Sequence, residues 1–100
     1  MLRNHVLIEG VLLNRQALRT TPAGVAIIEG TISHQSEQTE AGQKRKVDCE
    51  ILFVALGNIA QQIAQVPIGT AIKSKGFLAA RSMKFRQSLI FHLEAFDFLN

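Results

Sequence analysis

Cysteine is nearly absent from this sequence, in which Cys49 is the only one. A single thiol excludes an intramolecular disulfide and favours a reducing compartment. No stretch approaches the roughly 18 consecutive apolar residues that a membrane-spanning helix needs. The apolar run at residues 6–13 contains Glu9, which argues against a secretory signal peptide. We therefore expect a cytoplasmic protein that has no membrane segment.

The residue patterns of common enzymes and metal sites are missing as well. His5, His34 and His92 lie far apart in the sequence, with no ligand spacing and no pair of cysteines nearby. No glycine-rich loop is present that would cradle a phosphate group, and no two carboxylates have the spacing of a catalytic pair. We predict a protein that is not an enzyme and that uses no cofactor and no metal.

The positive charges that are present are clustered. The net charge is only +3, but residues 70–93 contain five cations and no acidic residue, and residues 44–46 add a second basic cluster. Clustering of this kind favours binding to a polyanion. The candidate nucleic-acid-binding residues are Arg19, Lys44, Arg45, Lys46, Lys73, Lys75, Arg81, Lys84, Phe85 and Arg86.

Each of these candidates also has a plain alternative. Arg19 can be a solvated turn residue, and residues 44–46 can be a soluble strand end whose cations are neutralised by nearby Glu residues. Phe85, between Lys84 and Arg86, either stacks on a base or folds back onto the protein.

Strand-like patterns dominate the 100-residue chain, and 47% of its residues are hydrophobic, which is ample for a core. Lys46, Asp48 and Glu50 alternate with apolar residues, as in a half-buried strand. We expect strands at residues 4–14, 25–35, 44–56, 69–80 and 88–99, a turn at 18–24, a long polar loop at 35–43 and a basic loop at 81–87. A short amphipathic helix is expected within residues 57–67, where Ile59, Ile63 and Val66 share one face.

Three strands, a helix and two strands is the element order of the OB-fold. The fold class predicted is therefore all-β: a five-stranded OB-fold barrel with one short helix between the third and fourth strands. Residues 1–100 form a single domain on this interpretation. The helix is expected to close one open end of the barrel.

Three segments of the sequence resemble bacterial single-stranded DNA-binding proteins. They are Asn4-x-Val6-Leu7-x-x-Gly10, Leu18-Arg19-x-Thr21-Pro22-x-Gly24, and Ile68-Gly69-Thr70-x-Ile72-x-x-Lys75-Gly76-Phe77-Leu78. General members of that group continue into a flexible linker and an acidic tail, whereas this chain ends at its last expected strand. Its length, and the segment Glu40-Ala41-Gly42 followed by basic residues and Cys49, resemble the PriB group of replication restart.

The resemblance implies a site for single-stranded DNA, but the sequence lacks the aromatic residues that such a site commonly uses. These families place a Trp on the third strand as a base-stacking platform, and this chain has no Trp and no Tyr. Asp48 is expected at that position. Stacking contributes roughly 1–3 kcal/mol per base, and a carboxylate there repels phosphate, so weaker DNA binding is expected.

The leading functional prediction is a non-enzymatic accessory protein of the replication-restart primosome that binds single-stranded DNA by backbone electrostatics. The resemblance implies a homodimer and a partnership with the PriA helicase, with DnaT as a further possible partner. Two alternatives stay open: a primosome module that mainly binds proteins, and a general coating protein for single-stranded DNA or RNA.

Overall fold

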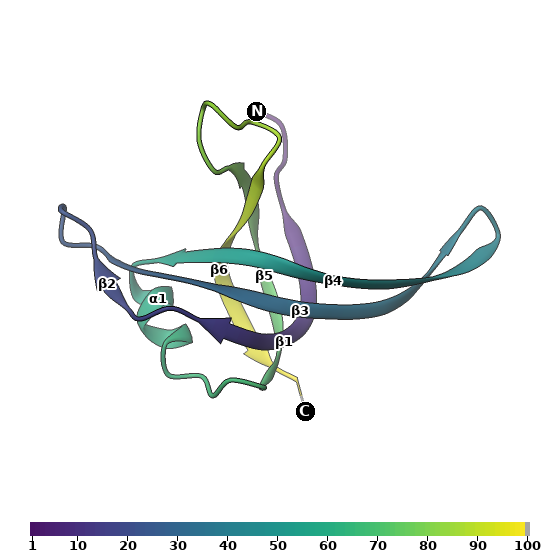
Figure 1. Cartoon of the computed structure of the whole chain (residues 1–100), viewed down its shortest axis with the longest axis horizontal. Coiled ribbons are helices and arrows are strands. Elements are labelled where there is room, and N and C mark those ends of the chain that lie inside the picture. Colours follow the sequence, from purple (N-terminus) through teal and green to yellow (C-terminus); the bar gives the residue numbers. More distant parts are fainter. Residues whose placement is uncertain (100) are drawn as a thin grey trace.

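The structure, a computed structural model, describes residues 1–99 and consists almost entirely of strands (Figure 1). The elements in chain order are β1 (Val6–Arg15), β2 (Arg19–Thr20), β3 (Ala26–Glu40), β4 (Gln43–Leu56), α1 (Asn58–Ile63), β5 (Ala71–Ala80) and β6 (Leu89–Phe98). Five of these strands match the five that the sequence predicts. The sixth, β2, is a two-residue strand that pairs with Ile27 and Ala26 of β3, inside the expected turn.

The five long strands close into a barrel in the order β1-β5-β6-β4-β3, because β1 pairs with β5 over its first half and with β3 over its second. Within residues 1–99 only the β4–β6 contact is parallel, and it places Phe53 beside Phe91. This arrangement, with a single short helix between the third and fourth long strands, confirms the OB-fold expectation.

Close approach between strands explains two of the glycines. A Cβ atom at Gly76 would lie 1.8 Å from the carbonyl oxygen of His92, at the point where the β5–β6 register shifts. A Cβ atom at Gly30 would lie 2.7 Å from the ring of Phe53. Glycine at these positions lets the strands bend into a small barrel.

The core is formed by alternate residues of each strand and by the helix. Its fully buried side chains include Leu12, Ile32, Phe53, Ile72 and Phe91. Ala60 and Ile63 of α1, with Val66 just after it, belong to the same hydrophobic cluster. Ile59 packs against this cluster from its edge. The helix therefore covers an opening of the barrel through the apolar face that the sequence predicts.

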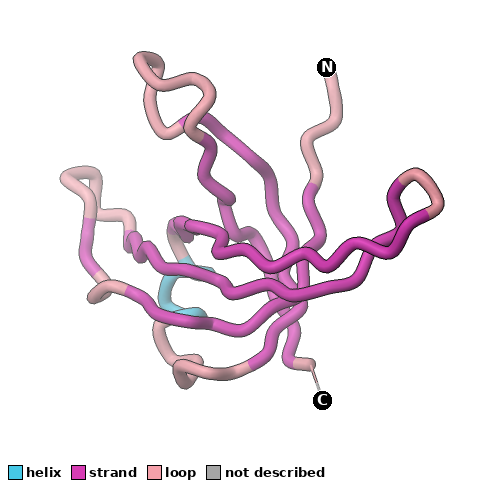
Figure 2. The backbone as a smooth tube through the Cα atoms, turned by 45° about the vertical axis from the view of Figure 1, so that its right-hand side comes forward, coloured by secondary structure: helices cyan, strands magenta, loops and turns pink. Residues whose placement is uncertain are grey.

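The expectation of a long polar loop at residues 35–43 is wrong. β3 and β4 continue pairing beyond the barrel to Glu40 and Gln43, and only Ala41 and Gly42 form the turn, both with positive φ. A two-residue turn of this kind suits the twist of a hairpin. The polar composition misled the prediction because both faces of this segment are solvated. We call residues 35–48 the arm; it extends to one side in both views (Figures 1 and 2).

The arm leaves the barrel at His34, whose ring is fixed on both sides. Its Nδ1 lies 2.6 Å from the carbonyl oxygen of Glu9 on β1, and its Nε2 lies 2.8 Å from Oγ of Ser36. Since a carbonyl oxygen can only accept, Nδ1 carries the proton and donates. In the neutral ring Nε2 then accepts from the Ser36 hydroxyl group, so the base of the arm is tied to β1.

Candidate nucleic-acid interface

The basic loop, residues 81–88, connects β5 to β6 and carries three of the predicted cations. Its ends are joined by a hydrogen bond of 2.9 Å from Arg81 N to Ser88 O, and a bond of 3.1 Å from Ser88 N to Phe85 O tightens its second half. Arg81, Lys84 and Arg86 are exposed. Among residues 1–99 none of these three cations forms an ion pair with a carboxylate.

Phe85 is exposed rather than folded back onto the barrel, with 60% of its surface accessible. The Nζ atom of Lys84 lies 5.7 Å from the centre of its ring, within the range of a cation–π contact. The loop therefore presents an aromatic face next to a cation, which is the combination that single-strand binders use for a base and its phosphate.

Two of the three cations of the arm already have acidic partners. Lys44 Nζ lies 3.6 Å from Glu37 Oε1, and an Arg45 guanidinium nitrogen lies 3.7 Å from Glu40 Oε1. Lys46 faces Glu37 directly across the hairpin. The alternative in which Glu residues neutralise this basic cluster therefore describes the arm better than DNA binding by unpaired cations does.

Arg19 lies in β2 and reaches Glu29 of β3 at 3.9 Å, with about half of its side chain exposed (51%). Lys73 and Lys75 lie exposed on the outer face of β5. In the sheet, Lys73 is flanked by Glu9 of β1 and Asp97 of β6. Although residues 70–93 contain no acidic residue in sequence, the neighbouring strands therefore place carboxylates beside Lys73 in the folded sheet.

The predicted residues do not share one compact site. The basic loop, the β2–β3 turn and the tip of the arm extend from the barrel in three different directions (Figures 1 and 2). Asp48 is exposed and lies on the same face of the hairpin as Lys46, where it accepts a hydrogen bond of 3.3 Å from Gln35. The arm, residues 35–48, thus contains three carboxylates and three cations.

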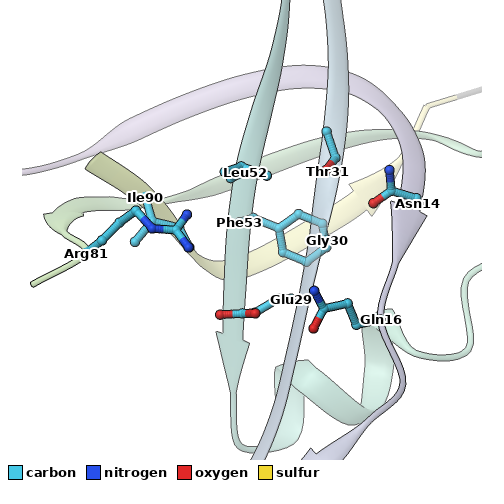
Figure 3. A pocket seen from close by; sticks show the side chains of 9 residues that line it. All are labelled: Asn14, Gln16, Glu29, Gly30, Thr31, Leu52, Phe53, Arg81 and Ile90. Carbon is cyan, nitrogen blue, oxygen red and sulfur yellow. The ribbon is translucent and has the colours of Figure 1, made fainter. Parts of the chain in front are cut away.

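A cavity of about 100 Å³ lies between the basic loop and the end of β1 (Figure 3). Arg81 is the only predicted site residue that lines it. The others are Asn14, Gln16, Glu29, Gly30, Thr31, Leu52, Phe53 and Ile90. Sequence reasoning missed these residues because they come from four separate strands and from the residue after β1, and no local spacing connects them. Only the pairing order of the barrel brings them together.

Strand β1 has an exposed apolar surface of its own. Leu7, Val11 and Leu13 on β1 are exposed apolar residues, and Leu7 has 62% of its surface accessible. Residues 6–10 of β1 pair with β5 alone, so among residues 1–99 their other edge has no strand partner, and its Glu9 carbonyl oxygen is hydrogen-bonded to the His34 ring. No helix among residues 1–99 has the length and apolarity to cross a membrane.

Comparison with known proteins gives concordant matches over most of the chain. A family model described as "another single-strand binding protein family" matches residues 4–95. The replication restart protein PriB of Nitrosomonas europaea is 33% identical over 91 residues, which cover 91% of this chain and 83% of that protein. PriB of Bordetella pertussis is 46% identical over 63 residues, and that match spans 63% of this chain and 59% of the relative.

Solved structures show the same relationship. The structure of PriB from Ralstonia solanacearum superposes with a TM-score of 0.89 at 27% identity, covering 99% of this chain and all of that one (100%). The wild-type single-stranded DNA-binding protein of Thermus aquaticus superposes with a TM-score of 0.77 at 27% identity, covering 98% of this chain and 50% of that chain. The likeness therefore extends over the whole barrel.

Proposed function

We propose that this chain, which belongs to the PriB group of the single-strand binding protein family, binds single-stranded DNA as an accessory protein of replication restart. The observation that carries the proposal is the basic loop. Its three cations have no acidic partners among residues 1–99, and its Phe85 is exposed beside Lys84.

In this mechanism phosphate groups bind Arg81, Lys84 and Arg86 while a base stacks on Phe85. Phosphate contacts of this kind carry no sequence information, so they allow the strand to be held at any position. The arm contributes less, because DNA must first displace Glu37 and Glu40 from Lys44 and Arg45. Arg19 and Lys73 supply only a diffuse attraction, since each lies beside a carboxylate. Lys75, whose strand neighbours are Leu7 and Ala95, adds a single exposed charge on β5.

Two charge reversals of equal size test this division. We expect Lys84→Glu with Arg86→Glu to weaken binding of a fluorescent oligo-dT by at least tenfold at low salt. The loop then carries one cation and two carboxylates in place of three unpaired cations. Lys44→Glu with Arg45→Glu serves as the matched control and should weaken it only two- to threefold, because those cations are paired in the free protein. Equal losses would contradict the proposal, as would binding that is absent or does not change with salt.

We further propose that the chain forms a homodimer and acts with the PriA helicase, and with DnaT, in the primosome. The free edge and the exposed apolar residues of β1 support the homodimer. The names of the PriB relatives support the replication-restart setting. The cytoplasmic location expected from the sequence belongs to the same proposal.

A second candidate function is a module that mainly binds proteins. Glu29, Asp48 and Glu50 on the outer face of β3 and β4 favour it, because carboxylates along the sheet oppose a phosphate chain. The two functions separate when helicase stimulation is measured with the Lys84→Glu, Arg86→Glu variant. Stimulation that persists after the loss of DNA affinity would favour the protein-binding function. Affinities for ribose and deoxyribose oligomers test the RNA alternative.

A further inference from the structure

The cavity in Figure 3 has a carboxylate in its wall at a place where a DNA-binding protein would be expected to offer donors or aromatic rings. We propose that this cavity is a subsite for one guanine base of bound single-stranded DNA, and that Glu29 accepts hydrogen bonds from that base. The proposal rests on the proposed function and adds base selectivity, which contacts to phosphate alone do not give.

The chemistry of Glu29 selects a base rather than a phosphate. An ionised carboxylate is acceptor-only, and phosphate oxygens are acceptors as well, so the two repel each other. A base, in contrast, can present donors. Glu29 is available for this contact, since 32% of its side chain is exposed and its Arg19 partner lies at 3.9 Å. An ion pair of that length leaves oxygen lone pairs free.

Among the four bases, guanine matches a carboxylate best. Its N1–H and its N2 amino group are adjacent donors, so both carboxylate oxygens can accept at once, and charge-assisted pairs of this kind are among the stronger hydrogen bonds. Thymine has one N–H between two carbonyl oxygens, which would face the carboxylate unfavourably. Adenine and cytosine each have an amino group next to an acceptor nitrogen. Glu29 therefore discriminates against all three.

The remaining walls suit the other parts of the same base. In Figure 3 the guanidinium group of Arg81 lies on the side of the view opposite Asn14 and Gln16, and Arg can donate to O6 and N7 of guanine. Leu52 and Ile90 give apolar surface for the ring. The side-chain amides of Asn14 and Gln16 form no hydrogen bond with any other residue among 1–99, so their donors and acceptors are free for the base.

The test compares 12-residue oligo-dT with the same oligomer containing one central dG, using fluorescence anisotropy. We expect the dG oligomer to bind roughly fivefold more tightly, the low end for a specific pair of hydrogen bonds. Deoxyinosine, which lacks only the N2 amino group, should lose most of this gain. Glu29→Gln should weaken dG binding, because one of the two accepting oxygens becomes an amide donor that faces the donors of guanine. It should strengthen dT binding, because the charge that repels phosphate is gone, so the preference disappears.

Glu50→Gln is the matched control. Glu50 of β4 lies on the same outer face of the sheet as Glu29 of β3, but it does not line the cavity. Its replacement should strengthen binding of both oligomers while the fivefold ratio between them stays. Thermal unfolding of each variant verifies that the barrel is intact.

The outcomes separate the two proposals. If dT binds and dG gives no gain, or if Glu29→Gln keeps the dG preference, the guanine subsite is overturned and the proposed function stands. If Glu50→Gln removes the preference as well, the effect is general electrostatics and the subsite is likewise overturned. If none of the oligomers binds at any salt concentration, both proposals fail together.

Discussion

Single residues without side chains decide how tightly this barrel closes. Gly76 is buried, and its α-carbon faces the backbone of β6 so closely that a methyl group would overlap the His92 carbonyl oxygen. By contrast, Gly24 lies in the exposed β2–β3 turn, where added atoms would meet nothing within 4 Å and only its positive φ of 84° disfavours other residues.

We expect Gly76→Ala to lower the free energy of unfolding by about 3 kcal/mol, because the strands must separate to admit the methyl group. Gly24→Ala should cost only about 1 kcal/mol, the penalty of a left-handed backbone conformation. Urea denaturation of both variants measures the difference. A Gly76→Ala protein as stable as the Gly24→Ala one would contradict the close approach of β5 and β6.

The arm is an element that contributes no side chain to the hydrophobic core. None of its residues is buried, and its contacts are the cross-strand hydrogen bonds, the two ion pairs and polar side-chain bonds such as Gln35–Asp48. The barrel ends of β3 and β4, in contrast, supply Ile28, Ile32, Phe53 and Ala55 to the hydrophobic cluster. The hairpin therefore consists of a folded base and a solvated extension.

A shortened hairpin tests this view of the arm. Because Ser36 pairs with Val47, replacing residues 37–46 by Asn-Gly leaves a two-residue turn of the type that hairpins favour. We expect the free energy of unfolding to change by less than about 1 kcal/mol, as for surface changes in general. Oligo-dT affinity should fall only two- to threefold. Loss of the folded state, or a tenfold loss of affinity, would show that the arm is essential.

How much the sequence could predict differs between strands and site. Alternation in residues 46–51 predicted β4 correctly, although only Ile51 of this stretch packs against the core. The same reasoning failed at residues 35–43, where both faces are solvated and polarity looks like a loop. It also failed for Lys73, Glu29 and Gln16, whose neighbours come from other strands. Periodicity records the burial of a residue, not which distant residue lies beside it.

At the scale of the whole molecule, β1 is the place where a second copy can add. In the described part of the chain, residues 6–8 have one edge with no strand partner, and the exposed Leu7 lies on this segment, as expected for strand-to-strand association. We expect Leu7→Lys to shift the proposed dimer toward monomer in sedimentation velocity. Ile68→Lys, which changes another exposed apolar residue, in the loop before β5, should leave the sedimentation coefficient as it is. Identical behaviour of the two variants would contradict a dimer through β1.

The ion pairs of the arm have a consequence for counterions. When phosphate binds a free cation, both partners release small ions, and single-strand affinity falls with a logarithmic salt slope of about −0.7 per contact. When phosphate instead replaces Glu37 on Lys44 or Glu40 on Arg45, the freed carboxylate takes up a sodium ion. The release of ions by DNA is then nearly cancelled. The salt slope of this protein therefore counts the contacts of its basic loop, about −2 for three cations, and hardly registers Lys44 and Arg45, however closely these two side chains touch the strand.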